Sequence, residues 1–278
     1  MSDTVRYVPD KYFEIAGTAI LVHHRGETTL PGSPPPLERG QTILFLHDAG
    51  ANGNSFASVM DALAEDHSPV SFDFPGHGRS GSLDSLASIE EFAQHTEELL
   101  REWDVGSLVV VGEGLGAAVG LELTKRQQVT VDALICIGTV GPDADLTEEI
   151  KELELITAGK ARRNFDTSGY APEPDEKVLR EAFAQWVKTD PRATLGARRA
   201  QRSWNAEAEL SGIGTPTLVV IGEHSESASR ESSEGLVRDL ADASVETLPG
   251  AGRHGAIEQP QSLAAVIART INSLGLSS

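Results

Sequence analysis

The chain alternates short apolar runs with longer segments in which apolar and polar residues follow a helical spacing. Most of the short runs are rich in β-branched residues and are bounded by Gly, Pro or Asp. Such runs are typical of strands that are buried on both faces of a sheet. The predicted strands span residues 42–46, 70–72, 107–111, 133–137, 217–221 and 244–248.

The other segments predict helices, a surface loop and an opening strand or hairpin. Residues 88–103 and 263–271 have the apolar spacing of helices, residues 13–24 alternate as a strand or hairpin does, and residues 31–40 are typical of a surface loop. Strands that alternate with helices indicate an α/β fold with a mainly parallel central sheet flanked by helices. In such a fold, reactive groups are expected at the carboxyl ends of the strands.

One long interval breaks this alternation. Residues 142–210 contain no strand-like run, but they contain charge-rich helical stretches at 148–161 and 175–188. We therefore expect one core domain made of residues 1–141 and 211–278, with a helical lid of residues 142–210 inserted over the strand ends.

The composition of the chain argues against some classes of binding partner and indicates a cellular compartment. The net charge of −19 argues against nucleic acid and against an anionic membrane surface, because both attract basic patches. The single cysteine, Cys136, cannot form an intramolecular disulfide, which fits a reducing compartment. The polar N-terminus and the lack of a membrane-length apolar run favour a cytoplasmic protein. No metal-ligand spacing stands out, and we expect no cofactor.

The most informative motif follows the apolar run at 109–111. Gly112-Glu113-Gly114-Leu115-Gly116 resembles the nucleophile elbow of the α/β-hydrolase superfamily, in which a strand, a sharp turn and a helix present a reactive side chain. That side chain would stand at Gly114. Because glycine has no side chain, no covalent intermediate can form there.

Three further segments agree with this family in order and spacing. The strand end His47-Asp48-Ala49-Gly50 stands where the family has its oxyanion loop, and residues 73–80 match its Asp-x-Pro-Gly-x-Gly-x-Ser turn. Residues 248–255 resemble the loop that carries its catalytic histidine. The resemblance runs from about residue 41 to residue 274 and includes the lid. It implies an α/β-hydrolase fold in which His47 holds its loop in shape.

By the same resemblance, His254 occupies the position of the general base, a role that suits imidazole near neutral pH. Ser225 stands where the family has the acid that orients this histidine, and a hydroxyl cannot stabilise an imidazolium as a carboxylate does. Glu226 is one candidate replacement for that acid. Asp143 is another, because some members of the family draw their acid from the end of the preceding strand.

The last departure is Asp48, which stands where the family usually has glycine. If the carboxylate points inward, it opposes a developing negative charge and could serve as an acid or base with His254. If it points outward, it is an ordinary turn residue. The resemblance assigns the backbone N–H groups of Ala49 and Leu115 to the oxyanion hole.

Two binding hypotheses rest on weaker patterns. Arginines of the lid, among them Arg198 and Arg202, could draw an anionic small molecule to the site, although charges on an exposed helix are the ordinary case. Gly112, Gly114 and Ala117 also fit a dinucleotide-binding pattern, but the acidic residue expected at the end of the next strand is missing.

Three functions remain open. The first is an enzyme that acts on a small organic molecule by His254-assisted proton transfer or water activation, as a lyase, cyclase or hydrolase-like enzyme, without a covalent acyl-enzyme. The second is a non-catalytic ligand-binding or interaction protein on a degenerate hydrolase scaffold. The third is an ester, lactone or carbon-carbon hydrolase whose nucleophile at Gly114 has been removed by engineering. The sequence favours the first and does not set the oligomeric state.

Overall fold

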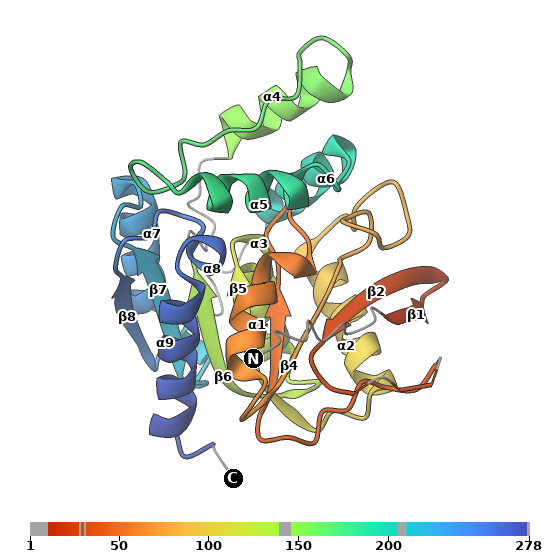
Figure 1. Cartoon of the computed structure of the whole chain (residues 1–278), viewed down its shortest axis with the longest axis vertical. Coiled ribbons are helices and arrows are strands. Elements are labelled where there is room, and N and C mark those ends of the chain that lie inside the picture. Colours follow the sequence, from red (N-terminus) through yellow and green to blue (C-terminus); the bar gives the residue numbers. More distant parts are fainter. Residues whose placement is uncertain (1–10, 28, 31, 139–145, 205–209, 277–278) are drawn as a thin grey trace, which may run out of the picture.

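The computed structural model of the chain describes residues 11–27, 29–30, 32–138, 146–204 and 210–276. An eight-stranded sheet forms the centre of the molecule (Figure 1). The first strand pairs antiparallel with the second, which pairs antiparallel with its other neighbour, and all later pairings are parallel. In spatial order the strands are β1 (Lys11–Ile15), β2 (Thr18–His24), β4 (Ser68–Phe72), β3 (Thr42–Leu46), β5 (Ser107–Glu113), β6 (Thr130–Ile137), β7 (Thr217–Gly222) and β8 (Ala243–Leu248).

Helices cover both faces of this sheet (Figure 1). One face packs against α1 (Ala57–Leu63) and α9 (Pro260–Ser273), which share a buried apolar cluster with Val109 and Val111 of β5. The other face packs against α2 (Ile89–Glu102), α3 (Leu115–Arg126) and α7 (Ser227–Asp239), together with Val110. Adjacent β5 side chains therefore point to opposite faces, as the pleat of a strand requires.

Three further helices lie between β6 and β7 in the sequence. They are α4 (Thr147–Thr157), α5 (Glu176–Trp186) and α6 (Pro191–Ser203), and they extend beyond the end of the sheet at which β5 meets α3 (Figure 1). The start of α6 is fixed locally, because the Asp190 side chain accepts a hydrogen bond from the Arg192 N–H at 2.8 Å and Pro191 occupies the first turn. These helices are called the inserted helices below.

The predicted fold class is confirmed. Every predicted core strand is present, and the structure lengthens most of them by one to three residues at their ends. The expected lid boundary at 141/142 lies outside the described residues, and the one at 210/211 falls within a short 3₁₀ turn, Leu210–Gly212. Cys136 is fully buried in β6. No helix of the described residues is long and apolar enough to cross a membrane.

Candidate functional site

The turn between β5 and α3 has the strained backbone of an elbow. Gly114 lies at φ +53° and ψ −111°, a conformation that L side chains rarely adopt. Its N–H donates to the Ile137 carbonyl at 3.1 Å, and its carbonyl accepts the Ala117 N–H at 3.1 Å, which starts α3. The elbow is thus held in shape by its backbone, and glycine is the residue that it accommodates at least cost.

Asp48 lies directly over this elbow. One of its carboxylate oxygens, Oδ1, accepts the Leu115 N–H at 2.9 Å. A β-carbon built on Gly114 would collide with this carboxyl group. The carboxylate of Asp48 therefore binds the N–H group that the family resemblance assigns to the oxyanion hole. It also fills the space that a nucleophilic side chain at position 114 would need. Ala49, the second expected donor residue, is buried directly after Asp48.

Arg198 of α6 also binds the carboxylate of Asp48. Its guanidinium binds Asp48 with two hydrogen bonds, Nη1 to Oδ1 at 2.8 Å and Nη2 to Oδ2 at 2.9 Å. It also donates to Glu149 of α4 and to Gln201, each at 2.9 Å. Arg198 is buried, so the bidentate pair joins the inserted helices to the core at the elbow.

The positive charge of Arg198 is neutralised within this cluster, by Asp48 and Glu149. Burial alone would raise the pKa of Asp48, but the charge and hydrogen bonds of Arg198 outweigh burial and hold that pKa well below its usual range. A carboxylate stabilised in this way is a poor proton acceptor. The positive charge of Arg198 is opposed by two carboxylates, so the structure gives little support to the hypothesis that Arg198 draws in an anionic ligand. Arg202 is exposed.

The loop that carries His254 is fixed by a neighbouring carboxylate. Glu258 accepts the N–H groups of Gly252 at 3.0 Å, His254 at 3.0 Å and Ala171 at 2.7 Å. The Ala171 bond links this loop to the segment between α4 and α5. His254 directly precedes the short helix α8 (Gly255–Glu258).

The imidazole of His254 is covered by that same segment. The ring of Tyr170 packs on it with centroids 4.6 Å apart, and a β-carbon on Gly169 would lie 3.2 Å from its Nε2. Burial, followed by the charge of Arg253, lowers the pKa of His254 to about 4. The ring is therefore neutral at pH 7. Within the described ranges, no side chain makes a hydrogen bond to its ring nitrogens.

The expected acid partners of His254 lie elsewhere or outside the described residues. The hydroxyl of Ser225 donates to the Gly252 carbonyl at 3.3 Å rather than to His254. Glu226 is exposed and stands at the N-terminus of α7. Asp143 belongs to residues 139–145, which are outside the described ranges. No described carboxylate takes the place of the missing acid by a hydrogen bond.

A second carboxyl group lies beside the elbow. Glu113, the last residue of β5, is 6% exposed, and its Oε1 has no hydrogen-bond partner among the described residues. Burial, followed by the negative charge of Asp48, raises the pKa of Glu113 to about 8. A glutamic acid and a histidine at one site thus have pKa values displaced in opposite directions.

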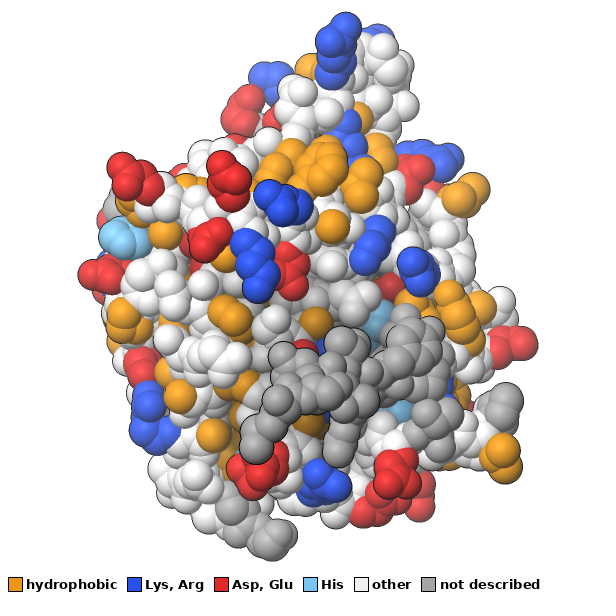
Figure 2. All heavy atoms as spheres, viewed as in Figure 1, with side chains coloured by type: hydrophobic (Ala, Val, Ile, Leu, Met, Phe, Trp, Pro, Cys, Tyr) orange, Lys and Arg blue, Asp and Glu red, His pale blue; other side chains and the backbone are white. Residues whose placement is uncertain are grey.

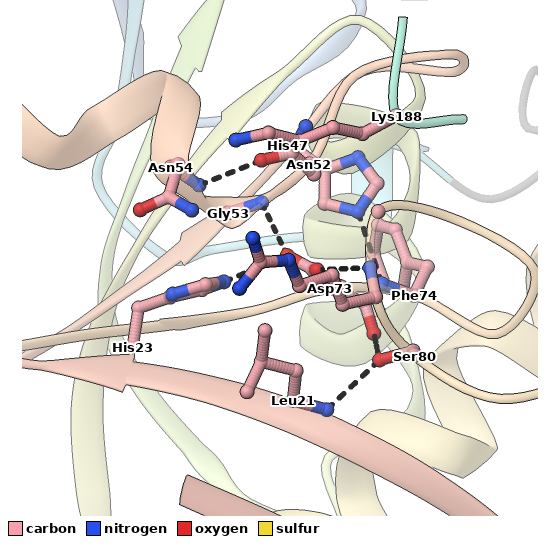
Figure 3. A network of polar contacts seen from close by, with 12 residues as sticks. Leu21, His23, His47, Asn52, Gly53, Asn54, Asp73, Phe74, Ser80 and Lys188 are labelled. Atoms are coloured by element: carbon pink, nitrogen blue, oxygen red, sulfur yellow. Dashed lines mark hydrogen bonds and ion pairs between the residues drawn. The ribbon is translucent and has the colours of Figure 1, made fainter. Parts of the chain in front are cut away.

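A polar network around Asp73 and His47 joins several neighbouring loops to β2 (Figure 3). Asp73 binds His23 Nε2 at 2.8 Å and accepts the backbone N–H groups of Gly53 at 2.9 Å and Arg79 at 2.8 Å. This carboxylate therefore ties β2 to two loops, and its position matches a structural role for the turn at residues 73–80.

His47 has the loop-holding role that the resemblance gives it. Its Nε2 accepts the Phe74 N–H at 3.0 Å, so its Nδ1 carries the proton and donates to the Asp48 carbonyl at 2.8 Å. This bond helps to fix the backbone from which the Asp48 carboxylate projects. Burial lowers the pKa of His47, which keeps the ring neutral in this arrangement.

Sequence reasoning did not identify three residues at the site. Gly169 and Tyr170 come from the inserted segment, where nothing in the local pattern marks a residue that will face His254. Glu258 could have been found, because a carboxylate four residues after His254 in a glycine-rich loop is well placed to accept its backbone N–H groups.

The described residues give little support for other ligand classes. They contain no group of three or more His, Cys, Asp and Glu side chains that could hold a metal ion. The N–H of Leu115, which a dinucleotide phosphate would approach at the start of α3, is already bound to Asp48. Acidic and basic side chains are interspersed on the face seen in Figure 2, unlike the continuous basic surface that nucleic acid requires.

Comparison with known sequences gives a consistent family. A sequence model described as the alpha/beta hydrolase family matches residues 43–266. The chain is 22% identical over 240 residues to a 2-hydroxy-6-oxo-6-(2'-aminophenyl)hexa-2,4-dienoic acid hydrolase of Metapseudomonas resinovorans, with 81% of this chain and 82% of that protein covered. It is 25% identical over 238 residues to a 2-(acetamidomethylene)succinate hydrolase of Mesorhizobium japonicum, covering 77% of this chain and 82% of the relative.

Solved structures agree at the level of the fold. A thermophilic esterase from Thermogutta terrifontis superposes with a TM-score of 0.78 at 16% identity, covering 96% of this chain and 99% of that one. An enol-lactonase from Burkholderia xenovorans gives a TM-score of 0.71 at 18% identity, with 94% and 99% covered. At these identities the likeness concerns the arrangement of strands and helices alone.

Proposed function

The chain belongs to the alpha/beta hydrolase family, and we propose that within this family it acts on a small organic molecule by proton transfer, without a covalent intermediate. His254 is the proton acceptor in this proposal. The inserted helices α4, α5 and α6 act as the lid of the site, and the reaction is of a lyase, cyclase or hydrolase-like type.

The position of Asp48 carries this proposal. Acyl transfer needs a nucleophile on the elbow and an N–H group that can stabilise a developing oxyanion. At Gly114 the side chain is absent and its space is filled, while the Leu115 N–H already has a carboxylate acceptor. A negative charge that developed beside Asp48 would be repelled rather than stabilised. These contacts favour chemistry that does not pass through a tetrahedral oxyanion at this place.

The state of His254 supports a role as a base. Its ring is neutral at pH 7, and it packs against Tyr170 and Gly169 of the segment that joins α4 to α5. A neutral imidazole can take up a proton from a carbon or oxygen acid in one step. Asp48 then serves to hold the lid through Arg198 rather than to move protons.

The names of the relatives suggest which compounds to test. Two of them are named as hydrolases of an oxo-dienoic acid and of a substituted succinate, both small carbonyl compounds. We therefore propose a panel of small carbonyl compounds that bear a C–H group next to the carbonyl. NMR would follow solvent deuterium entering that position, which requires a base to remove the C–H proton.

In this assay, wild-type protein is expected to accelerate exchange for at least one member of the panel, and His254→Ala to lose that acceleration by a factor on the order of 10² or more. His224→Ala provides a matched control, since His224 is exposed on a neighbouring loop. Full activity in His254→Ala, or labelling of the wild-type protein by a fluorophosphonate, would overturn the proposal.

The ion pair between Arg198 and Asp48 favours a second candidate function, that of a ligand-binding protein without catalysis. The Asp48–Arg198–Glu149 cluster stabilises a closed lid, and no described carboxylate orients His254. Under this candidate, a panel compound would raise the melting temperature and be recovered unchanged, with no deuterium incorporated. Under proton transfer, the stabilising compound would also exchange.

The third hypothesis, an engineered removal of the nucleophile, has less support. Restoring a serine at position 114 would place its β-carbon against the carboxyl of Asp48. A single replacement at Gly114 would therefore not return a fitting nucleophile. This favours Gly114 and Asp48 as a matched pair that belongs to the chain.

A further inference from the structure

Glu113 lies on the face of the sheet that meets the His254 loop. Val109 and Val111 of β5 pack in the same apolar cluster as Ala251 and Ala256, which flank His254 in the sequence. Side chains two residues apart on a strand share a face, so Glu113 continues the row formed by the two valines. The carboxyl group is thus directed toward the loop of His254 and away from α3.

The surroundings of Glu113 are unusual for a carboxyl group. It is buried, its Oε1 makes no hydrogen bond among the described residues, and no cation binds it directly within those ranges. Isolated buried carboxylates are costly, and such groups normally take up a proton instead. The charged and titratable groups that act on it are Asp48, Arg253, Glu258, Arg198 and Tyr170.

Several of these groups also act on His254. The charge of Asp48 affects both the carboxyl of Glu113 and the imidazole of His254, and the same is true of Arg253. Tyr170, whose ring packs on His254, is in turn affected by Glu113. The two groups therefore share one electrostatic environment at the elbow. In it, the carboxyl group is kept neutral and the imidazole is kept unprotonated.

We propose that Glu113 is the proton donor of this site and works together with His254 as the proton acceptor. This inference rests on the proposed function. The substrate class is a carbonyl compound with a C–H group beside the carbonyl, and the reaction begins with enolisation.

The proton balance of this step is simple. Nε2 of His254 takes the proton from the carbon, the electron pair of the broken C–H bond forms the C=C bond, and the carbonyl π electrons move onto oxygen. Glu113 gives its proton to that oxygen. The substrate leaves this step as a neutral enol, with an imidazolium at His254 and a carboxylate at Glu113. The imidazolium then gives its proton to the same or another carbon, and the O–H proton of the enol returns to the carboxylate of Glu113, which restores the protein.

A donor of this kind also explains how enolisation would proceed without the Leu115 N–H. The family's backbone donors stabilise a negative oxygen, but here the nearest of them is bound to Asp48. Proton transfer to the oxygen prevents a full negative charge from forming beside that carboxylate. A neutral acid is therefore compatible with Asp48 where an oxyanion is not.

The first test asks whether Glu113 is protonated, without using any substrate. Infrared difference spectra of wild-type protein against Glu113→Gln should contain, at pH 7, the C=O band of a protonated carboxylic acid, and this band should titrate near pH 8. Glu152→Gln, at an exposed position of α4, should give no such band at pH 7. A wild-type spectrum at pH 7 in which Glu113 contributes only carboxylate bands would overturn the inference.

The second test uses the deuterium-exchange assay on the carbonyl panel. Glu113→Gln should slow exchange by a factor on the order of 10² and remove the alkaline limb of the pH profile. In wild-type protein this limb should fall above pH 8, where Glu113 ionises, and activity should also fall below about pH 4, where His254 is protonated. Glu152→Gln should retain the wild-type profile.

The two proposals fail in different ways. If His254→Ala abolishes exchange while Glu113→Gln keeps both the rate and the alkaline limb, the proposed function stands and the role of Glu113 is wrong. If neither variant changes the exchange rate of a compound that the protein turns over, the proposed function itself is wrong. A Glu113→Gln variant that is folded by circular dichroism excludes unfolding as the cause of a loss.

Discussion

The carboxyl of Asp48 fills the space that a side chain on Gly114 would need. The two residues lie 66 positions apart, on the loops that follow β3 and β5, which are neighbours in the sheet. A substitution at either position alone should be unfavourable. A larger residue at position 114 would collide with the carboxylate of Asp48, and a glycine at position 48 would leave Arg198 without its main partner. Their effects on stability should therefore be coupled.

A double-mutant cycle measures this coupling. Gly114→Ser in the wild-type background should destabilise the protein by about 2–4 kcal/mol, because it adds overpacking and a side chain at positive φ. In an Asp48→Gly background the same substitution should cost less, since only the backbone strain remains. Urea unfolding of the four proteins gives the interaction free energy.

Fluorophosphonate labelling of these proteins is the functional control for that cycle. Gly114→Ser alone should remain unlabelled, whereas the Asp48→Gly, Gly114→Ser double variant presents a serine beside a vacant Leu115 N–H and should label. Additive free energies, together with equal labelling of both serine variants, would contradict the coupling.

The Arg198–Asp48 pair should contribute much more stability than a surface pair on the same helix. Arg198→Met leaves a largely enclosed carboxylate without its cation, and a loss of about 3 kcal/mol is expected. Arg199→Met is the matched control, because Arg199 pairs with Glu154 at 2.8 Å but both side chains are about half exposed. That pair should contribute less than about 1 kcal/mol.

The pH dependence of this difference has a defined sign. The folded-state pKa of Asp48 is depressed, so the stability it contributes is present above its unfolded pKa of about 4 and is lost as the pH falls through the folded value. In Arg198→Met the carboxyl group of Asp48 loses the cation that holds its pKa down, so it takes up a proton at a higher pH than in the wild type, and the stability gap should narrow as the pH falls from 7 toward 4. Urea unfolding across this range measures it, and a gap that widens in acid would refute the assignment.

A carboxylate at position 225 should act on His254. Ser225→Asp introduces a negative charge at the position of the family's acid, which should move the pKa of His254 upward from about 4 toward the ordinary range. NMR titration of the imidazole C–H resonances would report this shift. Glu226→Gln should leave the titration unchanged, because Glu226 is exposed and makes no described contact with the ring. A downward shift in the pKa of His254 in Glu226→Gln would place Glu226 closer to His254 than the structure does.

Buried histidines should make the protein less stable in mild acid. Burial lowers the pKa of five of them, so below about pH 6.5 the unfolded chain binds protons that the folded chain does not. Each such site lowers the unfolding free energy as the pH falls, and Glu113, whose pKa is raised, opposes them with a proton of its own. The five are His47, His67, His77, His95 and His254.

Urea unfolding between pH 7.5 and 5.5 tests this expectation. His77→Phe should reduce the pH slope by about one proton, since the folded pKa of His77 is about 3, whatever its effect on absolute stability. His224→Gln should leave the slope unchanged, because His224 is exposed. Stability that is flat or rising toward pH 5.5 would contradict the prediction.

The fold could be predicted because its signals are local. The strand at 42–46 and the hairpin at 13–24 are visible as runs of apolar or alternating residues, and their order along the chain implies the sheet. The elbow could be placed for the same reason, since Gly112, Gly114 and Gly116 mark a turn at which backbone segments approach closely.

The contacts of the site could be predicted only in part. Whether Asp48 points inward depends on Arg198, which stands 150 positions away, and no local pattern links the two. The cover over His254 comes from Gly169 and Tyr170, whose placement depends on how the inserted helices dock. The raised pKa of Glu113 depends on its burial by several segments and on the nearby charge of Asp48, which no local sequence pattern records.

The 150-residue separation of Asp48 and Arg198 has a consequence for the order of folding. Closing so long a loop is entropically unfavourable, so a contact of this kind forms only after the local strand and helix pairings that bring its ends together. The sheet and the elbow can then assemble first, and the docking of α6 onto Asp48 becomes a late event. In the native protein the same step can reverse without global unfolding. The amides of α4 and α6 would then exchange with solvent at a lower free energy than those of β5, and each such opening would leave the carboxylate of Asp48 without the guanidinium of Arg198.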